Sequence, residues 1–211
     1  MFYLPASTWW MRILWPSYTW QMSTTEKKLY LTFDDGPDPE ATAFVLNELK
    51  KYNAKGTFFC IGENVRKNQK LYRRILDDGH ATGNHTHRHP NGWKTPNLRY
   101  LDDVKEAAQC IDSGLFRPPY GRIRQAQYRR LAEAMGKDKV NVIMWSVLSA
   151  DFDISKNGEQ CFGFVRRYAK PGSIVVFHDS ARAFPNLSVA LPRTLEYFTN
   201  QGYEFERIPE I

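Results

Sequence analysis

The sequence predicts an α/β fold built from parallel βαβ units. Short runs rich in β-branched and aromatic residues alternate along the chain with amphipathic helical patterns, which is typical of parallel sheets. Either an open doubly wound sheet or a closed barrel satisfies this pattern. Seven strand-like runs in only 211 residues favour a compact barrel.

The expected elements follow one another in a regular order. Strands are expected at residues 29–33, 56–59, 80–83, 115–117, 140–145, 173–177 and 203–205. Helices are expected between them, at residues 39–52, 98–111, 125–135, 159–168 and 187–200. In the first helix Phe44, Val45, Leu49 and Tyr52 form one apolar stripe, and Pro39 suits the first helical turn.

We expect one main domain, at residues 26–211. The chain is 42% hydrophobic, which is enough for one sizeable core, and no Gly-, Ser- or charge-rich linker divides it. Residues 1–25 are expected to form an aromatic strap packed on this domain.

The first twenty residues contain seven aromatic side chains but match neither a signal peptide nor a membrane-spanning helix. They lack a basic start, an unbroken apolar run and a small-residue cleavage site. Pro5 and Pro16 also interrupt any helix of the roughly 20 residues needed to cross a bilayer. We favour the strap over an interfacial membrane contact made by Trp and Tyr. No export signal is readable, and the localisation stays open.

The formal charge of +6 does not indicate a nucleic-acid partner. Basic residues occur in pairs on expected helices, such as Lys50-Lys51, which usually mark solvated faces, and no nucleic-acid-binding motif accompanies them. Cys60, Cys110 and Cys161 are odd in number and widely spaced, so we expect buried free thiols.

Reactive side chains fall at the carboxyl ends of the expected strands. They are Asp34 and Asp35 after the first strand, His85 after the third, Arg117 at the end of the fourth, Asp151 after the fifth and His178 after the sixth. In a parallel barrel these ends form one rim, where such folds build active sites. We therefore expect these residues to meet.

His85 and His89 are candidate metal ligands. If the chain turns helically after the third strand, their spacing places both imidazoles on one face. The spacing alone is weak, because a single His is more often a satisfied core or surface residue. A rim carboxylate completes a set that suits Zn²⁺, and also Co²⁺, Ni²⁺ or Fe²⁺, and leaves room for water. His87, between them, is expected to point elsewhere.

Asp34 and Asp35 directly follow an apolar strand. Adjacent carboxylates at a strand end diverge, so one can bind a metal while the other faces a water molecule. The alternative is an Asx turn closed by Gly36 and Pro37. Two neighbouring carboxylates repel unless a cation lies between them, which favours the metal site.

Four motifs occur in chain order: TFDDGP at residues 32–37, HTHRH at residues 85–89, RPPYG at residues 117–121 and IVVFHD at residues 174–179. Together they resemble the motifs of NodB-homology polysaccharide deacetylases, also called carbohydrate esterase family four. The resemblance implies a distorted (β/α)7 barrel similar to a TIM barrel, in agreement with the seven strand-like runs. It makes residues 26–211 the catalytic domain.

The resemblance also implies roles for the rim residues. Asp34 would be the general base, while Asp35, His85 and His89 would hold one divalent metal ion, usually zinc. The remaining roles fall to His178 as the general acid, Arg117 as the residue that orients Asp34, and Tyr120, whose backbone N–H would help to stabilise the oxyanion.

One motif departs from the family pattern. Where relatives commonly have Asp-x-x-Asp-Trp after the fifth strand, residues 148–152 read LSADF, so the first acid is replaced by Leu148. Asp151 is kept and is expected to hold His178 or Arg117. Phe152 keeps an aromatic wall, and with Trp93 and Tyr120 it is a candidate for stacking on sugar rings or for packing.

The resemblance predicts a hydrolase that removes acetyl groups from N-acetylated amino sugars of a glycan such as peptidoglycan or chitin. Hydrolysis of O-acetyl esters on a glycan such as acetylxylan, and deacetylation of a small non-sugar amide, are alternatives that need the same machinery. A non-catalytic glycan-binding module is disfavoured, because no base, acid or metal ligand is missing. We expect an acetylated glycan as the partner, no nucleic acid, and a monomer.

Overall fold

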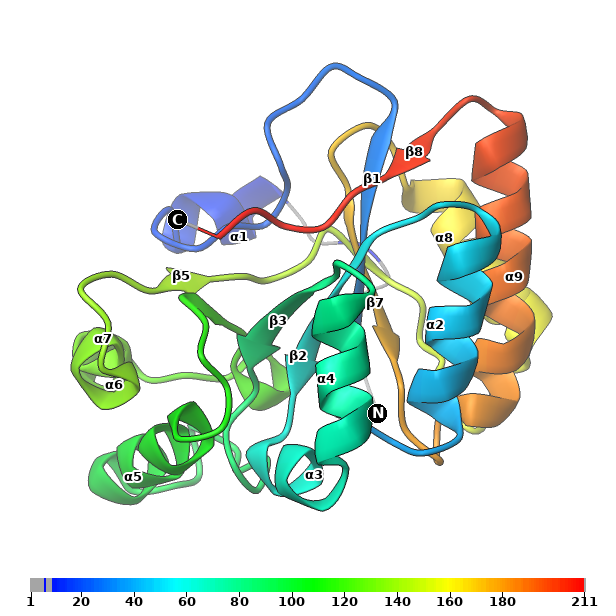
Figure 1. Ribbon diagram of the computed structural model, residues 1–211. Helices are drawn as coiled ribbons and strands as arrows, with labels where there is room; N and C mark the ends of the chain where they lie inside the picture. The colour runs from blue at the N-terminus through cyan, green and yellow to red at the C-terminus, as the bar shows by residue number, and fades with distance from the viewer. Residues whose placement is uncertain (1–5, 7–8, 211) are drawn as a thin grey trace.

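A computed structural model describes residue 6 and residues 9–210, and in this part of the chain seven strands form one parallel sheet surrounded by helices (Figure 1). The strand order is β5-β4-β3-β2-β1-β7-β6, and β8 pairs with the start of β1. The strands are β1 (Lys28–Asp34), β2 (Gly56–Cys60), β3 (Ala81–Asn84), β4 (Leu115–Phe116), β5 (Asn141–Val142), β6 (Val147–Leu148), β7 (Ile174–His178) and β8 (Glu204–Phe205).

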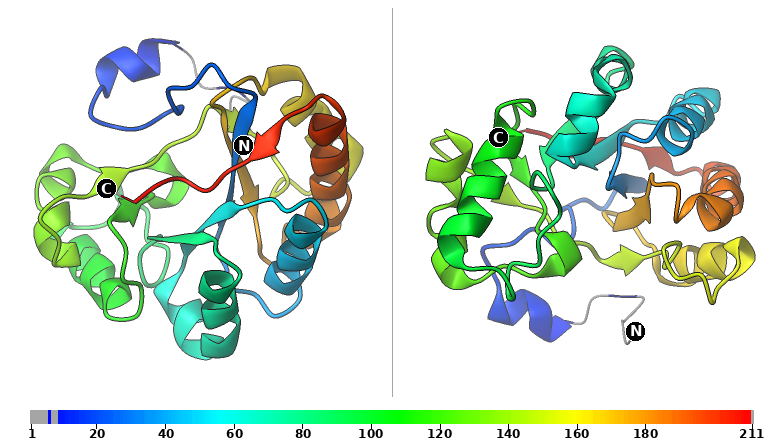
Figure 2. Two further views of the ribbon diagram at one scale, coloured as in Figure 1. Left: turned by 45° about the horizontal axis from the view of Figure 1, so that its top comes forward. Right: turned by 90° about the horizontal axis from the view of Figure 1, so that it is seen from below.

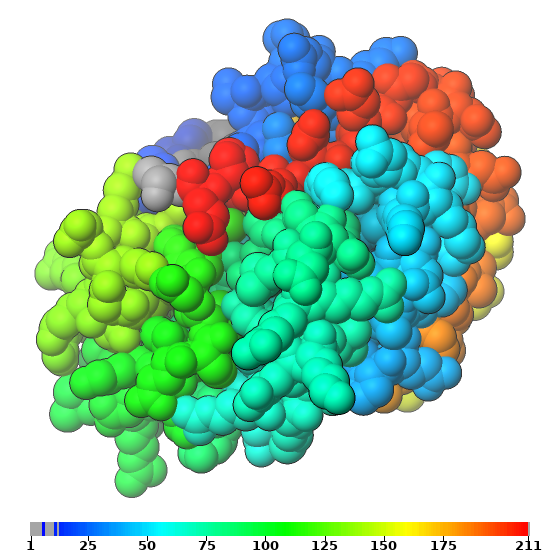
Figure 3. Space-filling model, in the orientation of Figure 1, coloured from blue at the N-terminus to red at the C-terminus, as the bar shows by residue number. Residues whose placement is uncertain are grey.

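The helices lie around the outside of this sheet (Figure 2). They are α1 (Trp9–Leu14), α2 (Ala41–Lys51), α3 (Gly62–Lys67), α4 (Gln69–Asp77), α5 (Asn97–Ala108), α6 (Gln125–Tyr128), α7 (Leu131–Met135), α8 (Gly158–Tyr168) and α9 (Phe184–Asn200), with a short 3-10 turn at Pro119–Gly121. The residues after β8 cross the surface between the N-terminal segment and α4 (Figure 3).

The central strands are apolar because both of their faces are covered. Every residue of β2 is buried, and β1 buries Leu29, Leu31 and Phe33. The Phe33 ring stacks on Phe58 of β2 and Phe177 of β7, with ring centroids 4.9 and 6.1 Å apart. These contacts fix β1 at the centre of the sheet, where its carboxyl end reaches the middle of the rim.

The sheet curls because its two edge strands are neighbours in the sequence. Only residues 143–146 separate β5 from β6, although the two strands lie at opposite ends of the strand order. Their proximity closes the sheet into a barrel with a seam between them. We use the word seam for residues 143–146, which join β5 to β6 where the sheet closes.

The N-terminal segment lies along this seam. Thr19 forms a parallel bridge with Ile143, and the Thr19 N–H and C=O bond to Val142 and Met144 at 2.9 and 2.8 Å. Trp20 follows it and is only 7% exposed. The segment therefore contributes both hydrogen bonds and buried apolar area to the barrel, while the division into a strap at residues 1–25 and a catalytic domain at residues 26–211 stays a prediction.

An apolar part of the same segment faces solvent. Ile13 and Leu14 at the end of α1 are 66% and 61% exposed, and Trp15 is 37% exposed. Among the described residues, no helix combines the length and hydropathy needed to span a bilayer.

The predicted α/β barrel is confirmed, but one strand was assigned wrongly. Residues 140–145 were expected to form a single fifth strand, whereas the structure has two short strands, β5 and β6. The chain cannot continue the ladder through residues 143–146, because the carbonyls of Ile143 and Met144 accept hydrogen bonds from the Arg117 side chain instead. The run at residues 203–205, counted as the seventh strand, is β8.

Helix prediction failed where the helices are short. Two helices between β2 and β3, α3 and α4, were not predicted, and the helix expected at residues 125–135 is divided into α6 and α7. The expected stripe of the first helix is correct, since Val45 and Leu49 of α2 are fully buried. The expectation of free thiols is also correct, although Cys110 is only half-buried.

Replacing Trp20 with Ala tests whether the N-terminal segment is part of the folding unit. The loss of this buried ring is expected to lower the free energy of unfolding by about 3 kcal/mol, as for other large-to-small core changes. Urea denaturation measures it, and Trp15→Ala, at a position 37% exposed, is the matched control. Equal small effects of both changes would show that the segment is only loosely attached.

Candidate metal and catalytic site

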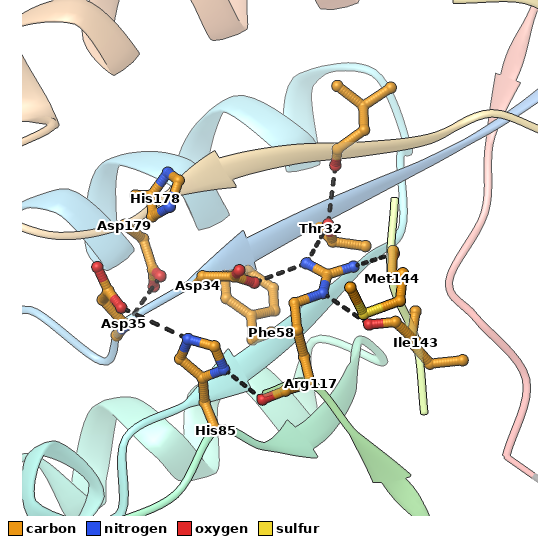
Figure 4. Close-up of polar contacts among 12 residues, drawn as sticks. Thr32, Asp34, Asp35, Phe58, His85, Arg117, Ile143, Met144, His178 and Asp179 are labelled. Carbon is orange, nitrogen blue, oxygen red and sulfur yellow. Dashed lines mark hydrogen bonds and ion pairs between the residues drawn. The ribbon is translucent and has the colours of Figure 1, made fainter. Parts of the chain in front are cut away.

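The rim residues predicted from the sequence meet at the carboxyl ends of the strands. Asp34 and His178 are the last residues of β1 and β7 and are paired in register. His85 directly follows β3, and Asp151 follows β6. Figure 4 shows Asp34, Asp35, His85 and His178 converging on one another from these strands.

The two adjacent aspartates point in different directions (Figure 4). Asp34 accepts a hydrogen bond from Nη1 of Arg117 at 2.7 Å, whereas Asp35 approaches the imidazoles of His85 and His89. The divergence is possible because Asp35 has a positive φ of 84°. The backbone thus separates the two carboxylates within one dipeptide, as expected for a strand end, and directs them to different partners.

Arg117 and Asp34 form a buried ion pair. Both side chains are almost fully removed from solvent, with side-chain exposures of 0% and 6%. Burial opposes ionisation of Asp34, but the adjacent Arg117 guanidinium, together with His178, outweighs it and holds the pKa of this carboxyl below its usual range. Asp34 is therefore a carboxylate at neutral pH.

The Arg117 guanidinium also satisfies three oxygens of the barrel. Nη1 donates to Thr32 Oγ1 at 2.7 Å, Nε to the Ile143 carbonyl at 3.1 Å, and Nη2 to the Met144 carbonyl at 2.9 Å. Its charged plane lies 4.1 Å from the centroid of the Phe59 ring. One side chain thus links β4, β1 and the seam between β5 and β6.

Asp35, His85 and His89 form a cluster with the donor chemistry of a metal site. Each offers one ligand atom, and these atoms lie within 4.8 Å of one another. Asp35 Oδ1 is 3.7 Å from His85 Nε2 and 3.4 Å from His89 Nε2, and it is buried without a hydrogen-bond partner among the described residues. A buried carboxylate oxygen without a donor is costly, and a cation at this point would remove the cost.

Both imidazoles can offer a nitrogen lone pair to a cation bound next to Asp35 Oδ1. His85 Nδ1 lies 2.7 Å from the Arg117 carbonyl, which can only accept, so Nδ1 carries the proton and Nε2 is the free nitrogen. Burial, with a contribution from His85, lowers the pKa of His89 to about 4, so this imidazole is neutral at pH 7. Two imidazole nitrogens and one carboxylate oxygen fit a divalent ion.

The loop that carries these histidines is not helical, contrary to the sequence interpretation. Residues 85–89 form a bend in which Thr86 and His89 have positive φ angles of 67° and 59°. The Asp103 carboxylate accepts hydrogen bonds from the backbone N–H groups of His87 and Arg88 at 2.6 and 3.0 Å, which ties the loop to α5. The convergence of His85 and His89 therefore comes from loop conformation rather than from helical periodicity.

His87 lies apart from the cluster, as expected for the middle histidine of the motif. Its Nε2 is 3.2 Å from the carboxylate of Glu106 on α5. Glu106 also binds Arg66 at 2.9 Å. His87 thus joins a network that holds the loop from the outside.

His178 is paired with Asp151. Asp151 Oδ1 is 2.8 Å from His178 Nδ1, and Oδ2 accepts the backbone N–H of His178 at 2.7 Å. Burial alone would lower the pKa of His178, but the Asp151 carboxylate outweighs it and raises the pKa to about 9. His178 therefore carries a proton on each ring nitrogen at neutral pH, and Nε2–H is the donor left for another group.

Tyr120 lies beside His89. Its ring centroid is 4.6 Å from that of His89, and the side chain is 52% exposed. A positive φ of 59° turns its backbone, and in the described part of the chain no hydrogen bond is recorded from its N–H. Phe152 packs edge-on against His178, with the centroids 5.1 Å apart. Leu148, in place of the family acid, is 7% exposed in β6.

Sequence reasoning gave no role to Asp179, although its carboxylate contacts the residues that follow Asp35. This carboxylate is fully buried, accepts the Gly36 N–H at 3.0 Å, and contacts the Thr42 hydroxyl of α2. A Cβ at residue 36 would lie 2.0 Å from Asp179 Oδ2, so only glycine fits there. Burial raises the pKa of Asp179. The carboxylate directly after His178 at a strand end was the signal that could have suggested this contact.

Comparisons with known proteins agree with this geometry. The sequence profile described as polysaccharide deacetylase matches residues 21–140, which is more than half of the chain. The chain belongs to this family. Enzymes of this family are metal-dependent hydrolases of acetylated glycans, which the barrel and the Asp35, His85 and His89 cluster fit.

Relatives of this deacetylase match it over most of its length. A peptidoglycan-N-acetylglucosamine deacetylase of Bacillus cereus is 33% identical over 199 residues and is matched over 92% of both chains. The crystal structure of a peptidoglycan N-acetylglucosamine deacetylase superposes with a TM-score of 0.86 at 28% identity, covering 96% of each chain. A family pseudoenzyme from Bacillus anthracis superposes with a TM-score of 0.77 at 25% identity, covering 90% of this chain and 66% of that one.

Replacing Arg117 with Ala is expected to destabilise the deacetylase strongly. The change leaves Asp34 as an uncompensated buried charge and the seam carbonyls without donors, which costs about 3 to 5 kcal/mol. Urea denaturation measures the loss, and Arg88→Ala, with a side chain 66% exposed, is the control. A loss below about 1 kcal/mol would contradict the inferred role of Arg117 in the barrel.

Proposed function

We propose that this deacetylase hydrolyses the N-acetyl group of N-acetylglucosamine units in a peptidoglycan strand. The observation that carries the proposal is the cluster of Asp35, His85 and His89, which converges at the rim with the Asp34 carboxylate and protonated His178. A base, an acid and a metal-binding set in one place are what amide hydrolysis requires. The named relatives supply the choice of N-acetylglucosamine and peptidoglycan.

Asp35, His85 and His89 are the residues that would hold the ion, and the proposed ion is Zn²⁺. Two imidazole nitrogens and one carboxylate oxygen match the ligand sets of catalytic zinc sites, although Co²⁺, Ni²⁺ and Fe²⁺ accept the same donors. When bound, such an ion polarises the acetyl carbonyl and makes water more acidic. All three ligands, the base and the acid come from one chain, and the protein is proposed to act as a monomer.

The protein side chains would handle the two proton transfers. Asp34 takes a proton from the attacking water, and Arg117 keeps this carboxylate ionised and fixed in direction. The water oxygen bonds to the acetyl carbon, and the Tyr120 N–H stabilises negative charge on the acetyl oxygen. As the carbon–nitrogen bond breaks, His178 gives its proton to the nitrogen, and Asp151 stabilises the proton on His178 beforehand. The products are acetate and a free amine.

An acetate-release assay tests this proposal directly. Purified protein with added Zn²⁺ is expected to release acetate from peptidoglycan and to act more slowly on acetylxylan. Asp34→Asn should reduce the rate by at least about a hundredfold, since general base catalysis contributes on this scale. Asp102→Asn, an exposed acid elsewhere, is the control. Release from acetylxylan alone would replace the N-acetyl substrate with an O-acetyl ester.

The metal content of two variants distinguishes a metal ligand from the proposed general base. His85→Ala removes a nitrogen donor and is expected to lower the Zn²⁺ content of the purified protein well below one per chain, measured by elemental analysis. Asp34→Asn should keep the wild-type content, because Asp34 binds Arg117 rather than the cluster. Full occupancy in the His85 variant would remove that residue from the ligand set.

The alkaline limb of the pH profile should depend on Asp151. A general acid must be protonated, so kcat/KM falls as pH rises through the pKa of His178, which Asp151 raises. Asp151→Asn removes the negative charge, lowers this pKa, and should move the alkaline limb to lower pH by about one unit or more. A lower rate with an unmoved limb would mean that Asp151 acts only on the position of His178.

A further inference from the structure

Two segments that carry rim residues contain basic residues and no acidic residues. Residues 79–101, which carry the two histidine ligands, and residues 113–132, which carry Arg117 and Tyr120, include no Asp or Glu. Within the described chain, the arginines of these segments that form ion pairs are Arg88, Arg117 and Arg130, and the histidines that do so are His85, His87 and His89. Arg122 has no ion pair there, so its charge is available to a ligand.

Arg122 lies against an exposed tryptophan in the segment that carries the histidine ligands. Its guanidinium carbon is 5.1 Å from the centroid of the Trp93 ring, and Trp93 is 52% exposed. Trp93 follows His89 by four residues, and Arg122 follows Tyr120, whose ring contacts His89, by two. The pair therefore borders the His89 side of the site.

This pair is held in place by the packing of one loop on the other. Trp93 Nε1 donates to the Ile123 carbonyl at 3.3 Å, and the buried Gln127 side chain donates to the Gly92 carbonyl at 2.9 Å. A Cβ at residue 92 would lie 2.3 Å from the Arg122 carbonyl, so the backbones touch at a glycine. A rigid aromatic surface beside a cation costs little ordering entropy on binding.

We propose that Trp93 and Arg122 form a subsite for a carboxylate-bearing sugar unit next to the N-acetylglucosamine that is deacetylated. The proposal rests on the proposed function, because a peptidoglycan strand alternates N-acetylglucosamine with N-acetylmuramic acid, whose lactyl group is a free carboxylate wherever no stem peptide is attached, whereas chitin is neutral. Trp93 packs against the sugar ring, and the two-pronged guanidinium of Arg122 binds the carboxylate. The subsite selects strands of alternating neutral and acidic sugars.

The test compares two forms of one polymer. Peptide-free peptidoglycan strands with free carboxylates, and the same strands with the carboxylates converted to methylamides, are assayed for acetate release. Arg122→Ala should raise the KM for the acidic strands about tenfold relative to the neutral strands, which is the scale of one charge-assisted hydrogen bond. Arg122→Lys should recover part of this ratio, and Trp93→Ala should raise KM for both forms.

Arg129→Ala, which removes an exposed charge from the same segment, is the control and should leave the ratio unchanged. The ratio is taken within each variant, so loss of folded protein does not alter it. An Arg122→Ala ratio equal to that of the wild type overturns the subsite. Absence of acetate release from both strand forms by the wild-type protein would instead overturn the proposed function.

Discussion

The ion pair between Arg117 and Asp34 is the constraint on which the rest of the site depends. An ionised pair with almost no solvent exposure is stable only if the other donors are satisfied. Nη1 of Arg117, which bonds Asp34, also bonds Thr32, while Nε and Nη2 bond the seam carbonyls of Ile143 and Met144. Because the Arg117 carbonyl also orients His85, one residue links the base, a proposed metal ligand and the closure of the barrel.

Much of this arrangement could be predicted from the sequence because strand ends are readable. Reactive residues follow apolar runs directly, so the alternation of strands and helices was enough to place Asp34, His85 and His178 on one rim. The diverging directions of Asp34 and Asp35 also followed from their position at a strand end. Recognition of four ordered motifs then supplied roles that spacing alone could not give.

The parts that could not be predicted depend on contacts between distant backbones. The bend at residues 85–89 requires positive φ at Thr86 and His89 and an anchor at Asp103, none of which has a periodic pattern in the sequence. The division into β5 and β6 arises because Arg117 takes the carbonyls of the seam. Hydrophobic periodicity predicts which face of an element is buried, but it does not predict which backbone groups form hydrogen bonds with a buried side chain.

The central position of β1 has a consequence for synthesis of the chain. β1 forms its ladder with β7, which is made about 140 residues later, so a nascent chain exposes one long edge of a very apolar strand until residue 178 has emerged. A ribosome-bound fragment that ends before β7 would already contain Asp35, His85 and His89 but would lack the acid. The strand order itself therefore leaves this edge open to pairing with other chains during synthesis until β7 covers it.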